Sequence, residues 1–289
     1  AKADSPKPTP PAEFIPGSFT IVALPDTQVY AEKYPDHFHK QAEWIAAHKE
    51  DRNIQFVTHL GDITNRNTRP QWEVARAAMS KLDGVVPYSL SLGNHDCGPG
   101  GNAANRDTML NEFFTVADAQ KSKALRGLMD PNRLDNSYHT FETAGRAFLV
   151  LALEWGPREE VIQWAGDVLK KHADHLTILT THAYIYYDSN RYDWKKFGKK
   201  QTWNPHSYKT AGLKGGTNDG EELWSKLVND NPQVFMTLNG HVLEDGLGQL
   251  RSTNSAGKDV HQILVNYQMK KEGGQAFLRL IEFHPERKI

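Results

Sequence analysis

The sequence has one cysteine, no excess of charge of either sign and no long apolar run, and each absence excludes a class of protein. Cys97 alone can form neither an intrachain disulfide nor a zinc site built on cysteines. Lys and Arg total 34 against 35 Asp and Glu, so the chain lacks the basic field that wraps nucleic acid, and we expect no nucleic acid as its main partner. No apolar run approaches the roughly 20 residues that span a bilayer, so we expect no transmembrane segment.

What is present fits a folded globular protein with a sizeable core. The chain has 289 residues, of which 38% are hydrophobic and 24% charged, a balance that excludes an intrinsically disordered protein. It also contains 13 histidines, and their positions carry most of the functional information.

The N-terminus resembles that of an exported protein. Ala1-Lys2-Ala3 has the small-x-small form of a signal-peptidase site, and the segment up to residue 16 is rich in proline. We expect a Pro-rich linker over residues 1–16 after signal removal, one domain over 17–289, and a secreted or periplasmic location. A shortened expression product with vector residues would begin in the same way, and a cytoplasmic location stays open.

Apolar periodicity predicts an alternation of strands and helices, followed by strands alone. The expected helices cover residues 36–49, 71–82, 106–116, 121–128, 159–171 and 219–228. The expected strands cover residues 18–24, 53–60, 85–92, 136–143, 147–154, 176–181, 233–238, 246–252, 260–268 and 276–284. This order is typical of an α/β protein with two mixed sheets packed face to face.

Polar side chains follow five of the predicted strands at the point where each strand ends. These side chains are Asp26 and Gln28, Asp62, Asn94 with His95 and Asp96, His182, and His241. Ligands bind at this edge of an open α/β sheet. Carboxylate, amide and imidazole donors without thiolate suit Mn, Fe, Zn or Ni. The i, i+2 spacing of Asp26 and Gln28 would point both side chains to one face of an extended backbone.

The ordered motifs Asp-x-Gln, Gly-Asp-x-x-Asn, Gly-Asn-His-Asp, His and Gly-His resemble those of the calcineurin-like metallophosphoesterase superfamily. The resemblance implies a four-layer α/β/β/α sandwich with a two-metal centre at the C-terminal strand ends. In that centre Asp62 would bridge both ions, Asn94, His182 and His241 would complete one site, and Asp26 and Gln28 would serve the other.

The same resemblance implies a reaction. A metal-activated hydroxide near Asp62 would attack a phosphomonoester or phosphodiester, and His95 would protonate the leaving group or bind a phosphoryl oxygen. Asp96 would either fix the His95 ring or cap a turn.

Three positions depart from the family pattern, and the first two concern the Asp26 side of the centre. Leu243 stands where a second metal-binding histidine is expected, Gln28 replaces a histidine, and Asn65 also stands where aspartate is common. Asp245 or Glu244 would replace the lost ligand, water or substrate would fill its place, or that ion would bind weakly. We expect two divalent or trivalent ions of the Mn, Fe, Zn or Ni class, one held more weakly. The alternative is a degenerate module that binds a phosphate ligand without catalysis.

The long connection over residues 183–217 is expected to form a wall of the substrate pocket. Within 191–214 it carries seven Lys or Arg against one acid, with aromatic residues interleaved, a composition that suits a phosphorylated small molecule, glycan or lipid head group. A solvated basic loop is the simpler alternative. Candidate substrate-binding residues are Arg158, Arg191, Trp194 and Tyr184, and Glu154 would support a ligand histidine. The sequence leaves the oligomeric state open.

Overall fold

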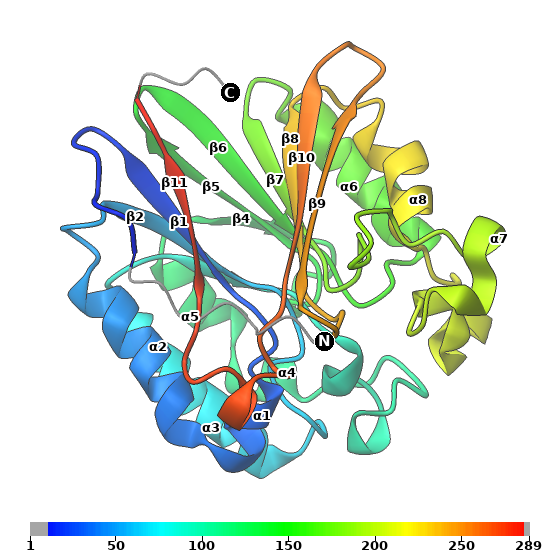
Figure 1. Cartoon of the computed structure of the whole chain (residues 1–289), viewed down its shortest axis with the longest axis horizontal. Coiled ribbons are helices and arrows are strands. Elements are labelled where there is room, and N and C mark those ends of the chain that lie inside the picture. The colour runs from blue at the N-terminus through cyan, green and yellow to red at the C-terminus, as the bar shows by residue number, and fades with distance from the viewer. Residues whose placement is uncertain (1–10, 286–289) are drawn as a thin grey trace, which may run out of the picture.

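Two β-sheets form the centre of the computed structural model, which describes residues 11–285 (Figure 1). The four-stranded sheet has the order β11-β1-β2-β3, and the seven-stranded sheet has the order β4-β5-β6-β7-β8-β10-β9. The strands are β1 (Phe19–Leu24), β2 (Ile54–His59), β3 (Tyr88–Leu90), β4 (Leu125–Leu128), β5 (Ser137–Thr143), β6 (Arg146–Ala152), β7 (Leu176–Thr180), β8 (Val234–Asn239), β9 (Leu247–Thr253), β10 (Asp259–Val265) and β11 (Arg279–Phe283).

Both sheets are mixed. In each sheet, the polar loops that follow the parallel strands lie at the same edge. β1, β2 and β3 are parallel, as are β6, β7, β8 and β10, whereas β11, β4, β5 and β9 pair antiparallel. The carboxyl ends of parallel neighbours lie at one edge of a sheet, so the residues that follow β1–β3 are brought together, and likewise those that follow β7 and β8.

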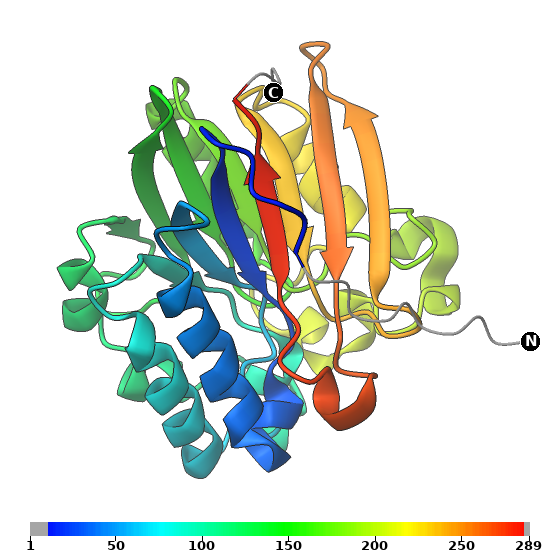
Figure 2. The same cartoon turned by 60° about the vertical axis from the view of Figure 1, so that its left-hand side comes forward.

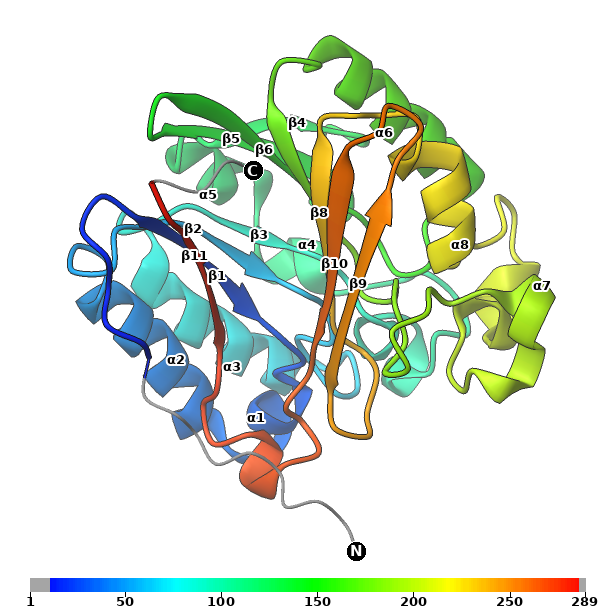
Figure 3. The ribbon, with the colours of Figure 1, turned by 45° about the horizontal axis from the view of Figure 1, so that its top comes forward.

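Helices cover the outer faces of the sheets, with α2 and α3 on one side of the molecule and α6 and α8 on the other (Figures 2 and 3). The α-helices are α1 (Gln28–Lys33), α2 (Pro35–Ala47), α3 (Arg69–Met79), α4 (Leu110–Phe113), α5 (Val116–Lys121), α6 (Glu159–Lys171), α7 (Trp194–Phe197) and α8 (Gly220–Leu223). This arrangement confirms the predicted four-layer α/β/β/α class. Among the helices of residues 11–285, none is both long and apolar enough to cross a membrane.

The alternation of side chains along β1 explains why two sheets pack together. Phe19, Ile21 and Ala23 belong to the apolar cluster between the sheets, whereas Val22 and Leu24 belong to the larger core that includes the helices. Both faces of the strand are buried, and burial of apolar surface contributes roughly 25 cal/mol per Å² to folding.

Two predicted helices between residues 106 and 128 differ in the structure. Residues 125–128 form strand β4, paired with β5, although a helix was predicted over 121–128. Of the segment 106–116, only Leu110–Phe113 and Val116, the first residue of α5, are α-helical. Just before Leu110–Phe113, the Asn105 and Thr108 side chains accept hydrogen bonds from the backbone N–H of Asp107 and Leu110, and such local bonds compete with the helical ladder.

The predicted N-terminal linker is described only from residue 11 onward. In the described part the Arg52 guanidinium donates to the carbonyl of Ala12, and the Ile15 N–H donates to Glu282 of β11. Residues 11–16 therefore lie along the four-stranded sheet. The predicted signal cleavage at residues 1–3 falls outside the described residues.

Candidate metal centre

The strand ends of the two sheets meet at Asp62. Asp62 follows β2 of the four-stranded sheet, while His182 and His241 follow β7 and β8 of the seven-stranded sheet. One ligand atom from each of these three residues lies within 4.8 Å of the other two, and all three side chains are buried. His182 Nε2 lies 3.2 Å from Asp62 Oδ2 and 3.9 Å from Asp26 Oδ1. Any ion bound by these residues would link the two sheets.

Hydrogen bonds fix which nitrogen each imidazole directs to the centre. His182 Nδ1 lies 2.7 Å from the Leu60 carbonyl, and His241 Nε2 lies 2.8 Å from the Trp203 carbonyl. A carbonyl only accepts, so each of these nitrogens carries the proton. His182 Nε2 and His241 Nδ1 are then the nitrogens that face the centre, and each can bind a metal ion once it carries no proton.

Buried polar atoms without hydrogen-bond partners show that this donor set fits a metal ion. The amide oxygen Oδ1 of Asn94 is buried without a hydrogen-bond partner among the described residues, and the buried His182 Nε2 makes no well-aligned hydrogen bond, although it lies close to Asp62 Oδ2. A buried acceptor without a partner costs about 1–3 kcal/mol, a penalty that coordination would remove. Carboxylate, amide and two imidazoles suit Zn, Fe, Mn or Ni.

Three glycines bring the motif backbones close enough for these contacts. A Cβ added at Gly93 would overlap the Asp62 carboxylate, and one at Gly240 would overlap the Asp26 carboxylate. Gly61 has φ +97°, and a Cβ there would lie 2.6 Å from His182 Nδ1. Only glycine fits at such close approaches.

The backbone is strained where the candidate ligands sit. Asp26, Asp62 and His241 have φ values of 40°, 49° and 73°, in the left-handed region that L-residues seldom adopt. Such strain costs of order 1–3 kcal/mol per residue and is concentrated at functional sites. Asp26 is thus not in an extended strand, and Gln28 opens helix α1. The extended-backbone prediction for this pair is wrong.

The carboxylates of the centre attract positive charge to the position of His182. Burial raises the pKa of the Asp62 carboxyl, but the neighbouring His182 and His95 outweigh burial and hold that pKa below its usual range. Burial lowers the pKa of the His182 imidazole, but the Asp62 and Asp26 carboxylates outweigh it and raise that pKa to about 9. A metal ion that replaced the His182 proton would neutralise the same carboxylates.

His95 lies beside the centre with its ring orientation fixed. Its backbone N–H donates to Asp62 Oδ1 at 2.9 Å, and its ring nitrogen Nδ1 lies 2.9 Å from the Asn65 carbonyl. Nδ1 therefore carries the proton, and Nε2 of this partly exposed ring is available to a substrate.

Asp96 does not hold the His95 ring. Its carboxylate accepts hydrogen bonds from the backbone N–H groups of residues 63, 64 and 93. Of the two predictions for Asp96, its contacts match the turn cap.

The structure gives Glu154 a different partner from the predicted ligand histidine. The side chain of Glu154 pairs with Arg106 and Arg158 and accepts from the Asn136 amide. The Trp155 ring, which sequence reasoning did not single out, packs against His182 and His241 with ring centroids 5.8 and 5.0 Å away. Glu154 therefore anchors the segment that carries this indole.

The four predicted substrate-binding residues are engaged elsewhere. Arg158 pairs with Glu154 and Glu160. Arg191 pairs with Glu221 and stacks over the Trp224 ring. These ion pairs leave both guanidinium groups already neutralised. The Tyr184 side chain is fully buried, and Trp194 stacks on His206. Their placement does not support the predicted contacts with substrate.

Three other aromatic residues of the 183–217 connection reach the centre, among them the buried Tyr192, whose ring centroid lies 6.1 Å from that of His241. Trp203 is 37% exposed, and its carbonyl accepts from His241. Tyr208 packs edge-on against Trp155, with ring centroids 5.0 Å apart, and its ring centroid lies 6.3 Å from that of His241. The interleaved aromatic residues signalled this wall, but the sequence does not tell which of them face the centre.

The Asp26 side of the centre is poorer in ligands. Asp245 is exposed and its carboxylate accepts from the Leu247 N–H, while Glu244 is also exposed, so of the three alternatives for Leu243 their placement does not support an acidic replacement. Gln28 directs its Nε2 to Asp62 Oδ2 at 2.9 Å. Gln268, a residue missed by sequence reasoning, directs its Nε2 to Asp26 Oδ1 at 3.2 Å.

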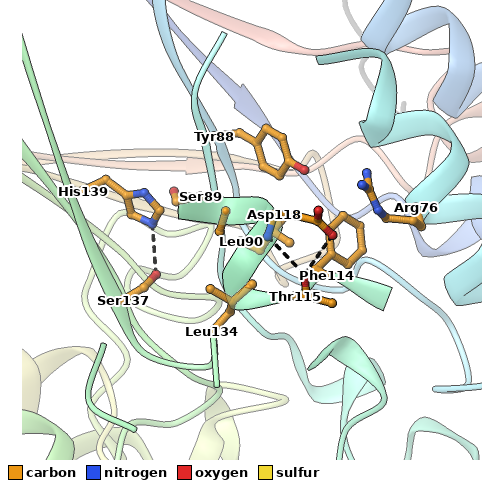
Figure 4. A pocket seen from close by; sticks show the side chains of 11 residues that line it. Arg76, Tyr88, Ser89, Leu90, Phe114, Thr115, Asp118, Leu134, Ser137 and His139 are labelled. Atoms are coloured by element: carbon orange, nitrogen blue, oxygen red, sulfur yellow. Dashed lines mark hydrogen bonds between the residues drawn. The ribbon is translucent and has the colours of Figure 1, made fainter. Parts of the chain in front are cut away.

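Two further features of the described residues lie outside this centre. His206, Asp219 and Glu222 also have ligand atoms within 4.8 Å of one another, but His206 already donates to Glu222, and the two Asp219 oxygens accept from the Glu222 and Trp194 N–H groups. This cluster therefore serves to pin the 183–217 connection. Figure 4 shows a separate pocket lined by Arg76, Tyr88 and His139, where no predicted site residue lies.

The chain is similar to several known proteins. The uncharacterized protein YvnB of Bacillus subtilis (strain 168) is 32% identical over 284 residues, which are 95% of this chain but only 19% of that protein. The chain therefore spans about a fifth of the relative's length. Among solved structures, it is similar to a purple acid phosphatase, PPD1, from yellow lupin (17% identity, TM-score 0.47, 85% of this chain and 43% of that one). It is also similar to the NAD nucleotidase NadN of Haemophilus influenzae (14% identity, TM-score 0.48, 93% and 48%). Residues 19–258 match the model of the calcineurin-like phosphoesterases, and the chain belongs to that family.

Proposed function

We propose that the chain is a metal-dependent hydrolase of phosphoesters. The observation that carries this proposal is the buried cluster of Asp62, His182 and His241, in which backbone carbonyls fix the orientation of both imidazoles; the buried, unpartnered Oδ1 of Asn94 would add a fourth ligand. We call these four residues the histidine-side site. A metal ion held there would supply Lewis acidity, lowering the pKa of a water and offsetting charge on the phosphoryl oxygens.

His95 is the residue best placed to handle the leaving group. Its backbone bond to Asp62 keeps the ring next to the histidine-side site, and its Nδ1–H bond to the Asn65 carbonyl fixes the ring plane. The free Nε2 would hydrogen-bond a phosphoryl oxygen or, when protonated, pass a proton to the leaving oxygen.

Trp203 and Tyr208 form the wall on which the organic part of the substrate would rest. Trp203 holds a left-handed backbone conformation with φ 62°, which is a genuine outlier for a bulky residue. Its indole is exposed beside the carbonyl that orients His241. An exposed aromatic face beside a phosphoester centre suits a phosphorylated small molecule with a ring, such as a sugar or glycan, or a lipid head group.

A substrate panel tests the proposal. Wild-type protein and Asp62→Asn would be assayed on p-nitrophenyl phosphate and bis-p-nitrophenyl phosphate with Mn²⁺, Zn²⁺ or Fe²⁺. We expect metal-dependent turnover by the wild type of at least one of the two substrates, which also separates monoesterase from diesterase, and its loss in the variant. Binding of inorganic phosphate without turnover of either ester would contradict hydrolysis and support a binding module.

A further inference from the structure

Two glutamine side chains bind the two carboxylates of the centre through their amide N–H groups. Gln28 Nε2 lies 2.9 Å from Asp62 Oδ2, and Gln268 Nε2 lies 3.2 Å from Asp26 Oδ1. The two glutamines are separated by 240 positions in the sequence, but both reach the side of the centre where the family resemblance implies a second ion.

The fold brings Gln268 to this place because β10 is a sixth strand that ends at the same edge. β10 is parallel to β8, whose end delivers His241. Beyond β10, the Asn266 N–H donates to the Gly246 carbonyl, and the Asn266 side chain accepts from the Gln268 N–H. These two bonds fix the turn that directs the Gln268 side chain toward Asp26.

Hydrogen bonds reach both carboxylate oxygens of Asp26. Its two oxygens accept from the His241 backbone N–H at 3.0 and 3.1 Å, and Oδ1 also accepts from Gln268. Amide N–H groups are donors only and carry partial positive charge, so they stabilise a carboxylate as a weak substitute for a cation. The position that the family pattern gives to a second imidazole is held by Leu243, which has no ligand atom.

We propose that Gln28 and Gln268 form an amide clamp that takes the place of the second cation. The protein then holds one metal ion, at the histidine-side site, and the clamp keeps Asp26 and Asp62 in position beside it. This inference rests on the proposed metal-dependent function. It replaces the expectation of two ions and makes both glutamines positioning residues.

Metal counting tests the clamp directly. Protein would be loaded with Mn²⁺ alone, passed through a desalting column, and analysed for Mn per chain by mass spectrometry and for Mn–Mn coupling by electron paramagnetic resonance. We expect one ion per chain and an uncoupled signal. Two retained ions per chain with a coupled signal would overturn the clamp and leave the proposed function standing. No retained ion would overturn the histidine-side site and the clamp with it.

Substitutions in the clamp test the converse, namely that removing it lets a second ion bind. Gln268→Glu replaces the donor with a carboxylate next to Asp26, and we expect the count to rise from one Mn to two. The matched control Gln55→Glu, at a partly buried glutamine of β2, should leave the count at one. The double variant Gln28→His/Leu243→His restores the two imidazoles of the family pattern and should also raise the count to two, which keeps the test valid if Gln268→Glu does not fold. A count that stays at one in every folded variant would contradict the clamp.

Discussion

Each of the three candidate site histidines has one ring nitrogen bound to a backbone carbonyl, and its other ring nitrogen makes no bond to a carbonyl. Leu60, Asn65 and Trp203 supply these carbonyls to His182, His95 and His241. Residue identity alone predicts that His182 and His241 are donors, because they follow strand ends. It does not predict the tautomers, which depend on contacts that span up to 122 residues of the chain.

At the residue scale, a substitution of His95 tests whether catalysis can be lost while metal binding is kept. In His95→Asn we expect kcat to fall by about 10²–10⁴-fold, because general acid catalysis contributes that much, with the metal content unchanged. Steady-state kinetics and metal analysis on the same preparation check this. The surface variant His175→Asn is the control, and loss of the ion from His95→Asn would make His95 a ligand instead.

Substitutions of Asp62 and Asp245 test which of these two carboxylates binds the metal ion. Asp62→Asn keeps the shape of the side chain but removes the charge that faces His182, so we expect the ion to be lost. Asp245→Asn should bind metal as the wild type does, because Asp245 caps an exposed turn. Titration with Mn²⁺, followed by calorimetry, distinguishes the two variants. Equal weakening in both would restore Asp245 as a replacement ligand.

At the scale of elements, the sequence predicts most strands and helices because their apolar periodicity is clear. The hairpin β5–β6 and helix α6 match their predictions closely. β4 was mistaken for a helix because a short strand at a sheet edge is stabilised by pairing with β5 rather than by its own pattern. Gln268 was missed because its strand end carries no motif, and only the parallel register of β10 with β8 brings it to Asp26.

Glu154 holds the loop that follows β6 in place through its ion pairs with Arg106 and Arg158. Glu154 is 4% exposed and faces Arg106 and Arg158. Glu154→Gln would leave the partly buried Arg106 guanidinium without a carboxylate and Arg158 with Glu160 alone, and we expect the free energy of unfolding to fall by about 3 kcal/mol. Urea denaturation measures this fall. The exposed pair of Glu159 with Lys226 provides the control, because Glu159→Gln should cost less than about 1 kcal/mol. Equal costs would argue against the anchor.

At the scale of the whole molecule, the histidine-side site joins the two sheets. Asp62 and Asn94 come from loops of the four-stranded sheet, and His182 and His241 come from the seven-stranded sheet. The general fold and this edge could be predicted from the sequence, because parallel strands place their carboxyl ends together. The positions of Trp155, Trp203 and Tyr208 could not, because aromatic residues in a long connection carry no periodic signal.

An ion that joins the sheets stabilises the folded state as a whole. Binding at about 1,000 times the dissociation constant would add about 4 kcal/mol to the free energy of unfolding. We therefore expect a chelator to lower the Tm of the metal-loaded protein in differential scanning calorimetry. In His182→Ala the chelator should leave the Tm unchanged, and an equal shift in both proteins would place the stabilising ion elsewhere.

The most direct test of the histidine-side site is anomalous X-ray diffraction from crystals of the Mn²⁺-loaded protein. We predict an anomalous peak within bonding distance of the Asp62 carboxylate, Asn94 Oδ1, His182 Nε2 and His241 Nδ1. Diffraction from such crystals with no peak among these four side chains would contradict the account, as would a peak confined to His206, Asp219 and Glu222.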